Sequence, residues 1–254
     1  MARIDYEELM DKCEEANKSP ATFYRKDFIK SDESVETPNK KSCRTELISE
    51  YIVANFRLDK ISVVEREKYK YPTHKGESDG NEVVEKVLAK ELFSKCKNGY
   101  SFNCIGTIKD YETPLEKENK SHGAAIDLLS VNHDDKKVYI LELKREGSPE
   151  SLLRCILEAY TYLRMVHKEN LFKKDNFNIP SDYNLVAAPL IFSGKGKSSC
   201  WNRAWQQVQE MEKGHMPKLC ALIEKLKKTL DKGYELAMPF YLSKTENGDY
   251  IVSR

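Results

Sequence analysis

The sequence predicts an α/β protein with a mixed sheet. From residue 79 onward, the hydrophobic pattern gives the order helix, three strands, helix, strand. Two of the strands are separated only by a short polar turn, whereas the last strand follows a helix, and this combination predicts a sheet of mixed strand direction. With 254 residues, the chain is long enough for one large domain or two small ones.

The first 75 residues are expected to form an N-terminal helical extension. Two helix-like stretches, at 6–17 and 45–56, are separated by a polar stretch at 30–41 that is typical of a loop. A break in the pattern follows, where the letters read YPTHKG. We therefore predict an extension over 1–75 and a second unit over 76–254.

The second unit is expected to begin with a helix over about 79–95. Its start resembles a capping box, and Val84, Leu88 and Leu92 form its apolar stripe. The alternation of apolar and polar residues then predicts three strands. We place a short one at 100–108 and two stronger ones at 124–131 and 137–144.

A second helix is predicted to start at the letters SPE, residues 148–150. Ser is a good N-cap, Pro suits the first helical position, and an acid suits the first turn. We expect this helix to run to about residue 168. A strand at 183–192, one or more helices to about 230 and a hairpin through Asn247 and Gly248 complete the chain.

Composition and charge exclude several classes of protein. Hydrophobic residues make up 40% and charged residues 33%, which indicates a folded chain with a heavily charged surface. The formal net charge is +1, so an anionic partner must be met by a local patch. No export signal or membrane span is apparent. The seven cysteines are scattered and form no Cys-x-x-Cys pair, which argues against zinc or disulfide frameworks and favours a cytoplasmic location.

The hairpin of the two stronger strands carries the most informative residues. If its polar turn is central, Val131 pairs with Val138 and Asp127 lies directly opposite Glu142. Opposed residues point to the same face with their Cβ atoms about 4.5–5.5 Å apart, so two carboxylates there can share a cation. Lys144 lies on that face too, two residues after Glu142.

Two opposed carboxylates among apolar neighbours repel each other and lose solvation, so a bound cation is the simplest compensation. Asp127, Glu142 and the backbone carbonyl of Leu143 would supply hard oxygen ligands for Mg²⁺ or Mn²⁺. Lys144 would orient or deprotonate the attacking water, and partial burial would lower its pKa. The alternative is a chance hairpin with charges at a sheet edge.

This pattern resembles the PD-(D/E)XK nuclease superfamily, whose restriction-endonuclease-like core is a helix, a three-stranded meander, a helix and a strand. The resemblance covers about residues 79–192. It implies an acid on the first helix, an Asp and a Glu-x-Lys on neighbouring strands, and a polar residue followed four positions later by Tyr on the next helix. The matching residues in this chain are Glu85, Asp127, Glu142, Lys144, Glu158 and Tyr162.

Two positions depart from the family pattern. Ile126 stands where the name-giving proline would be, and Glu158 replaces the usual Gln. Glu158 is therefore either a further metal ligand or an accessory residue, and its helix face points either to the cleft or to solvent. We prefer Glu85 as the first-helix acid and as a further metal ligand, because Glu82 already has a capping role.

The resemblance implies a Mg²⁺-dependent deoxyribonuclease with DNA as its partner, serving restriction, defence, repair or the processing of mobile elements. A double-strand cutter of this kind would be expected to form a homodimer. Lys195, Lys197 and Arg203 form a candidate surface for contact with DNA phosphates, whereas the lysine-rich helix that follows is expected to be solvated. The alternative is a catalytically inactive protein that binds nucleic acid or serves as a scaffold on the same fold.

Overall fold

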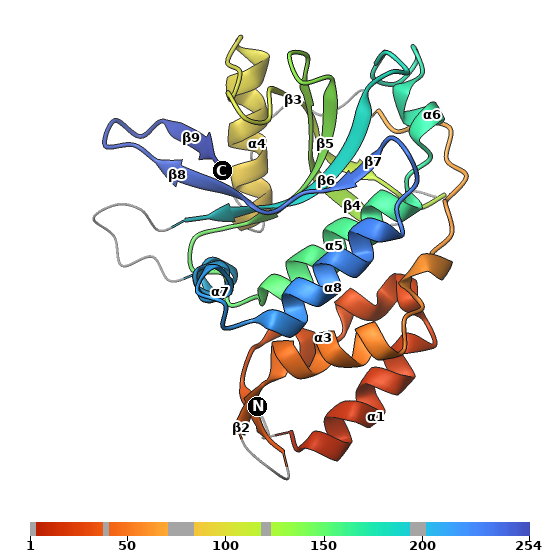
Figure 1. Cartoon of the computed structure of the whole chain (residues 1–254). Coiled ribbons are helices and arrows are strands. Elements are labelled where there is room, and N and C mark those ends of the chain that lie inside the picture. The colour runs from red at the N-terminus through yellow and green to blue at the C-terminus, as the bar shows by residue number, and fades with distance from the viewer. Residues whose placement is uncertain (1–3, 38–40, 71–83, 118–122, 194–201) are drawn as a thin grey trace.

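A computed structural model describes residues 4–37, 41–70, 84–117, 123–193 and 202–254. It shows a mixed α/β fold in which helices cover both faces of a seven-stranded sheet (Figure 1). This architecture confirms the mixed sheet that the sequence predicts.

The sheet has the strand order β3-β4-β5-β6-β8-β9, and β7 pairs with β6 beside this path. Neighbours in β3-β4-β5 and in β8-β9 run antiparallel, whereas β6 runs parallel to β5, β7 and β8. The strands are β3 (Thr107–Pro114), β4 (Ala125–Asn132), β5 (Lys137–Lys144), β6 (Asn184–Phe192), β7 (Tyr234–Leu236), β8 (Phe240–Lys244) and β9 (Tyr250–Ser253).

The two faces of the sheet have separate cores because alternate residues of each strand point to opposite sides. On one face, α4 (Val84–Lys97) packs against β3, β4 and β5. On the other face, α5 (Leu152–Met165) packs against β5 and β6 (Figure 1). Leu141 belongs to the first core and Ile140 to the second. The helices α6 (Lys168–Phe172), α7 (Arg203–Glu212) and α8 (Pro217–Lys228) complete the C-terminal half.

The N-terminal segment extends the core on the α5 face. Its α3 lies against α8, and its buried side chains, Leu9, Phe23 and Ile48 among them, belong to the same cluster as Leu157 of α5 (Figure 1). Its elements are α1 (Tyr6–Asn17), the 3₁₀ helix η1 (Pro20–Arg25), α2 (Asp27–Lys30), β1 (Ser34–Glu36), β2 (Lys41–Cys43), α3 (Arg44–Ala54) and the 3₁₀ helix η2 (Leu58–Lys60). The predicted extension is therefore packed into the rest of the chain.

Asp32 fastens this segment to α7. Its carboxylate accepts hydrogen bonds from Thr45 N at 3.0 Å, Gln207 Nε2 at 2.7 Å and Arg203 Nη2 at 2.6 Å. Burial alone would raise the pKa of Asp32, but hydrogen bonds from Cys43, Thr45 and Arg203 outweigh burial and leave the pKa lowered. The ionised carboxylate of Asp32 thus links the N-terminal segment to α7.

Three expectations are wrong: two concern the bounds of strands and one concerns the burial of a side chain. The stretch at 30–41 contains β1 and the first residue of β2 instead of a plain loop. The strand expected at 100–108 begins at Thr107, because Phe102 and Gly106 exchange backbone hydrogen bonds in a tight loop in which Gly106 has a φ of 73°. Val84, predicted to lie on an apolar stripe, is 60% exposed.

Other parts of the pattern are confirmed. Leu88 and Leu92 are buried as expected, and β8 and β9 form the predicted terminal hairpin. The predicted capping box lies outside the described residues. Among the described residues, no helix is long and apolar enough to cross a membrane.

Candidate active site

The hairpin of β4 and β5 has the register that the sequence predicts. Val131 pairs with Val138, and the ladder runs to the pair Leu128 and Leu141. The turn is set by Asn132, whose side-chain oxygen accepts hydrogen bonds from two backbone amides within the turn. In this hairpin the start of β4 lies beside the end of β5. Asp127, Glu142 and Lys144 lie at these two strand ends.

Asp127 lies one residue beyond the last described pair of this ladder, so its predicted pairing with Glu142 is not part of it. Its Oδ2 accepts a hydrogen bond of 2.8 Å from the backbone amide of Leu143. The Asp127 carboxylate therefore lies beside β5, where its charge contributes to the raised pKa of Glu142.

Glu142 and Lys144 lie on the face of β5 that α5 covers. Their exposed fractions are 4% and 3%, and Lys144 Nζ lies 2.7 Å from Glu142 Oε1. Strand geometry explains the contact, because residues two apart on a strand share a face. The predicted Glu-x-Lys pair is therefore a buried ion pair.

Two further carboxylates approach Lys144 from the start of α5. Its Nζ lies 2.8 Å from Glu150 Oε2 and 3.6 Å from Glu158 Oε2. Arg154 lies between these two acids, with its Nε 3.1 Å from Glu150 Oε1. Glu158 is 6% exposed, so its helix face points inward and not to solvent. We call Glu85, Asp127, Glu142, Lys144, Glu150, Arg154 and Glu158 the carboxylate cluster.

Helix α5 starts later than expected, and this changes the position of Glu150. The N-cap is Ser151, whose hydroxyl accepts a hydrogen bond from Arg154 N, and not Ser148. Ser148 to Glu150 consequently precede the helix, so Glu150 is free to turn back toward Lys144. The expected end at residue 168 is also late, since α5 ends at Met165 and α6 follows.

Glu85 reaches the same place from the opposite face of the sheet. It lies in the first turn of α4, and its Oε1 accepts a hydrogen bond of 3.3 Å from Arg145 N, directly after β5. Its negative charge also contributes to the raised pKa of Asp127. The first-helix acid chosen from the sequence is therefore brought to the end of the hairpin.

The carboxylate cluster contains more negative than positive charge. Five carboxylates face two cations, Lys144 and Arg154. Among the described residues, no hydrogen-bond partner is found for Glu142 Oε2, although this oxygen is buried. A buried carboxylate oxygen without a partner is costly, and a bound cation would satisfy it. Two nitrogens of Arg154, Nε and Nη1, are also buried without a described hydrogen-bond partner.

The environment of the two strand carboxyl groups, Asp127 and Glu142, favours their neutral form, whereas the pKa of Glu150 is lowered. Burial raises the pKa of Asp127 to about 7, with further contributions from the charges of Glu158 and Glu85. Burial, followed by the charges of Asp127 and Glu158, also raises the pKa of Glu142 well above its usual range. The folded protein without a cation thus opposes the charge on both strand carboxylates.

The pKa of Lys144 moves opposite to the expected direction. Burial alone would lower the pKa of Lys144, but the charges of Glu142 and Glu158 outweigh burial and raise it well above the usual range. The expectation of a lowered pKa is wrong because it considered burial without the charges of Glu142, Glu158 and Glu150. The raised pKa favours the charged form of Lys144 in the metal-free protein.

The raised pKa of Asp127 gives a first prediction. The folded state holds a proton that the unfolded chain releases near pH 4, so metal-free stability falls as the pH rises from about 4 toward 7. We compare the melting temperatures of wild type and Asp127→Asn in EDTA. Between pH 4.5 and pH 8, the melting temperature of wild type should fall by about 5 °C relative to that of Asp127→Asn. Thermal denaturation across that range measures it, and a constant difference contradicts it.

Asp127 and Glu142 are the members of the cluster best suited to hold a divalent cation. Among the described residues, no three Asp, Glu, His or Cys side chains are gathered as a ready-made metal cage. Mg²⁺ rarely uses such a cage, since it is usually held by one or two carboxylates together with water and substrate phosphates. Asp127 and Glu142 supply hard oxygen donors of this kind, and the unpartnered Glu142 Oε2 is a free donor atom. The pair therefore fits Mg²⁺ or Mn²⁺.

The Leu143 carbonyl, predicted as a third ligand, belongs to the residue whose amide holds Asp127. Its role as a ligand stays a prediction.

Four residues near the site were not predicted as site residues. The pairs Glu150–Arg154 and Arg154–Glu158 have the spacing of neighbours on a helix, and this signal could have identified them. Tyr24 and Arg25 lie far away in the sequence, and no local pattern links them to Tyr162. The structure nevertheless joins Tyr24 OH to Tyr162 OH at 3.4 Å.

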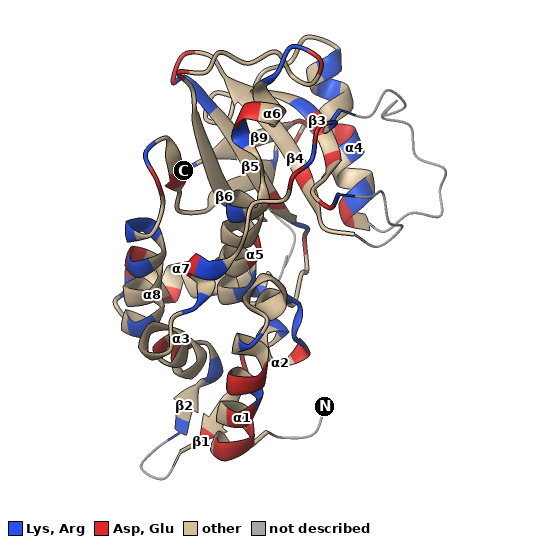
Figure 2. Cartoon of the chain, turned by 90° about the vertical axis from the view of Figure 1, so that its right-hand side faces the viewer, with Lys and Arg blue, Asp and Glu red and all other residues tan. Residues whose placement is uncertain are grey.

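The candidate phosphate-contact residues are not brought together by described contacts. Arg203 is engaged by Asp32 and also donates to Gln206 Oε1 at 3.1 Å. Lys195 and Lys197 lie outside the described residues. Acidic residues predominate on α1, which carries red segments in Figure 2, so this helix is unsuited to contact with phosphates.

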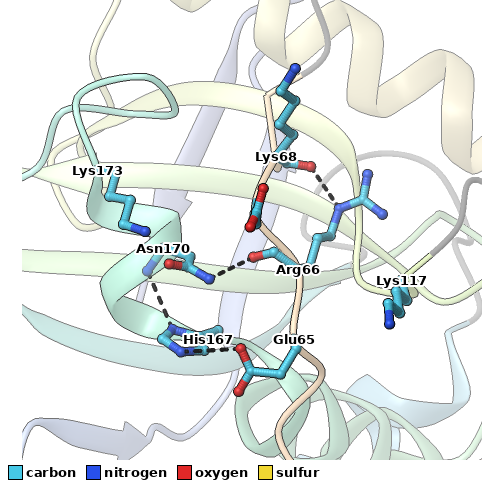
Figure 3. A pocket seen from close by; sticks show the side chains of 8 residues that line it. Glu65, Arg66, Lys68, Lys117, His167, Asn170 and Lys173 are labelled. Atoms are coloured by element: carbon cyan, nitrogen blue, oxygen red, sulfur yellow. Dashed lines mark hydrogen bonds and ion pairs between the residues drawn. The ribbon is translucent and has the colours of Figure 1, made fainter.

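A surface cavity of about 710 Å³ lies between residues 65–68 and α6 (Figure 3). Its lining includes Arg66, Lys68, Lys117 and Lys173. None of its lining residues belongs to the carboxylate cluster, so this cavity is not where the cluster would act.

Comparison of the chain with known proteins finds no matching family model, no matching curated protein and no matching solved structure. Any assignment of function therefore depends on the geometry of the chain itself.

Proposed function

We propose that the protein is a metal-dependent nuclease that hydrolyses phosphodiester bonds in DNA, with a core of the restriction-endonuclease-like type. The observation that carries this proposal is the half-buried Asp127 beside the buried pair Glu142 and Lys144 at the adjoining ends of β4 and β5, with an excess of carboxylates and an oxygen of Glu142 that has no described donor. The element order α4, β3, β4, β5, α5, β6 supports it, because it is the order of the PD-(D/E)XK core.

Mg²⁺ or Mn²⁺ would be held by Asp127 and Glu142, with Glu85 and Leu143 O as further ligands. When bound, such an ion polarises the scissile phosphate and lowers the pKa of coordinated water. Lys144, whose Nζ lies beside Glu142, would donate a hydrogen bond to the attacking water and stabilise negative charge that develops on the phosphate.

Glu158 and Tyr162 have an accessory role in this proposal. Tyr162 OH donates a hydrogen bond of 3.1 Å to Glu158 Oε1, while Glu158 Oε2 faces Lys144. Glu158 thereby limits how far Lys144 can turn. DNA as partner, a homodimer that presents one site to each strand, and a cytoplasmic location remain predictions.

Cleavage of DNA tests the proposal. Supercoiled plasmid, linear duplex and single-stranded DNA are incubated with Mg²⁺, Mn²⁺ or EDTA, and we expect cleavage that EDTA abolishes. Asp127→Asn should reduce the rate by about a thousandfold, because it removes a charged metal ligand. Asp110→Asn is the control, since Asp110 is an acid of the same sheet but is outside the cluster.

Two outcomes would count against the proposal. Cleavage that persists in Asp127→Asn would mean that the site lies elsewhere. Binding of DNA without cleavage under every condition would favour the inactive scaffold.

A further inference from the structure

The carboxylate cluster is in contact with the N-terminal segment through η1. Tyr24 of η1 is 2% exposed, and its ring packs edge to face on that of Tyr162, with the ring centroids 5.7 Å apart and an interplanar angle of 84°. This contact joins residues 138 positions apart in the sequence. It places the hydroxyl of Tyr24 next to an accessory residue of the proposed site.

Three hydrogen bonds then run in one direction from the surface to Glu158. Arg25 Nε donates to the Tyr24 hydroxyl at 2.8 Å, Tyr24 OH donates to Tyr162 OH at 3.4 Å, and Tyr162 OH donates to Glu158 Oε1 at 3.1 Å. Because the first donor is a cation and the last acceptor is a carboxylate, each bond polarises the next. We call Arg25, Tyr24 and Tyr162 the donor chain.

The donor chain ends at the group that faces Lys144. Glu158 Oε1 accepts from Tyr162, whereas Glu158 Oε2 lies 3.6 Å from Lys144 Nζ and 3.9 Å from Arg154 Nε. One oxygen of Glu158 is therefore held by a hydrogen bond from Tyr162, and the other is attracted by two cations. Loss of the hydrogen bond from the tyrosines would let Glu158 turn further toward Lys144 and Arg154.

We infer that Tyr24 and Arg25 are positioning residues of the active site, which act through Tyr162 to hold Glu158 away from full contact with Lys144. The N-terminal segment is then part of the catalytic unit and not a separate extension. This inference rests on the proposed function. In Tyr24→Phe the ring contact is kept but the hydroxyl is lost, so Glu158 neutralises Lys144 more fully and leaves it less able to hold water or a phosphate oxygen.

Tyr160, which lies on α5 together with Tyr162 and Glu158, provides a matched control for Tyr24. It is fully buried like Tyr24, and its hydroxyl is 2.8 Å from Thr229 Oγ1, with no described contact to Glu158. Tyr160→Phe therefore removes one buried hydrogen bond from the same core without touching the donor chain. A purely structural role of Tyr24 would make the two variants behave alike.

The first measurement is the steady-state kinetics of plasmid cleavage by the full chain in saturating Mg²⁺. We expect Tyr24→Phe and Arg25→Gln to lower kcat by about tenfold with KM changed less than about twofold, and Arg25→Lys to restore most of the rate. Tyr160→Phe should keep the wild-type kcat. An unchanged kcat in Tyr24→Phe overturns the inference. A raised KM with unchanged kcat in Arg25→Gln also overturns it, since Arg25 would then be a phosphate contact.

The second measurement does not depend on activity. We expect Tyr24→Phe to lower the melting temperature by about 3 °C in the wild-type background but by only about 1 °C in Glu158→Ala, because the two groups are coupled. Tyr160→Phe should give equal shifts in both backgrounds. Equal shifts for Tyr24→Phe overturn the inference even if wild type cleaves DNA. Coupling without cleavage by wild type supports the positioning of Glu158 and overturns the proposed nuclease.

Discussion

Replacement of Lys144 by methionine is expected to lower the free energy of unfolding at pH 8 by about 3–5 kcal/mol. Lys144 is 3% exposed and is the shared partner of Glu142, Glu150 and Glu158. Methionine keeps much of the side-chain volume but leaves these acids buried without their cation. Urea denaturation followed by circular dichroism measures the change.

The loss in Lys144→Met should be smaller at pH 5, because the pKa of Glu142 is already raised and this acid takes up a proton when its partner is removed. Lys136→Met is the control, since Lys136 also forms an ion pair, with Asp182, but on the exposed surface. Its stability should equal that of wild type, as expected for a solvent-screened pair. A Lys144→Met protein as stable as wild type at pH 8 would show that the cluster is not the strained arrangement described above.

Replacement of Glu142 by glutamine is expected to have opposite effects on activity and stability. The raised pKa of Glu142 means that the folded, metal-free protein opposes its charge, so the neutral amide should raise the melting temperature in EDTA at pH 8 by about 2–4 °C. Cleavage should fall by about a thousandfold or more because a charged metal ligand is lost.

The same variant should also lose the rise in melting temperature that Mg²⁺ gives to wild type, since only the folded state binds the ion. Differential scanning fluorimetry with Mg²⁺ or EDTA measures both effects. A Glu142→Gln protein that is less stable than wild type would identify Glu142 as a structural partner of Lys144, and would favour the inactive scaffold.

The hairpin and its three chemical residues could be predicted because the information is local. The turn at Asn132 fixes the register, and strand alternation then places Asp127, Glu142 and Lys144 together. Glu158 and Tyr162 follow from the resemblance and from helix spacing. Their inward orientation could not be decided until the packing of α5 on β5 was known.

The electrostatics of the site could not be predicted from the strands alone. The pKa of Lys144 is raised most by Glu142 and further by Glu158 and Glu150. The last two reach Lys144 only because α5 starts at Leu152 and lies across β5. The role of the N-terminal segment depends on a contact between Tyr24 and Tyr162, for which helix and strand periodicity hold no information. The strand β3 was misplaced because polar residues such as Asp110 interrupt its apolar pattern while lying buried.

A divalent cation at the ends of β4 and β5 is the feature on which the proposed nuclease depends. Crystals of the full chain soaked in Mn²⁺ and measured at a wavelength where manganese scatters anomalously would locate it. We predict one strong anomalous peak about 2.0–2.3 Å from carboxylate oxygens of Asp127 and Glu142, with water completing the coordination. The peak should be missing in Glu142→Gln. No peak at this position in wild type, or a peak elsewhere that survives in Glu142→Gln, would contradict the assignment of the site.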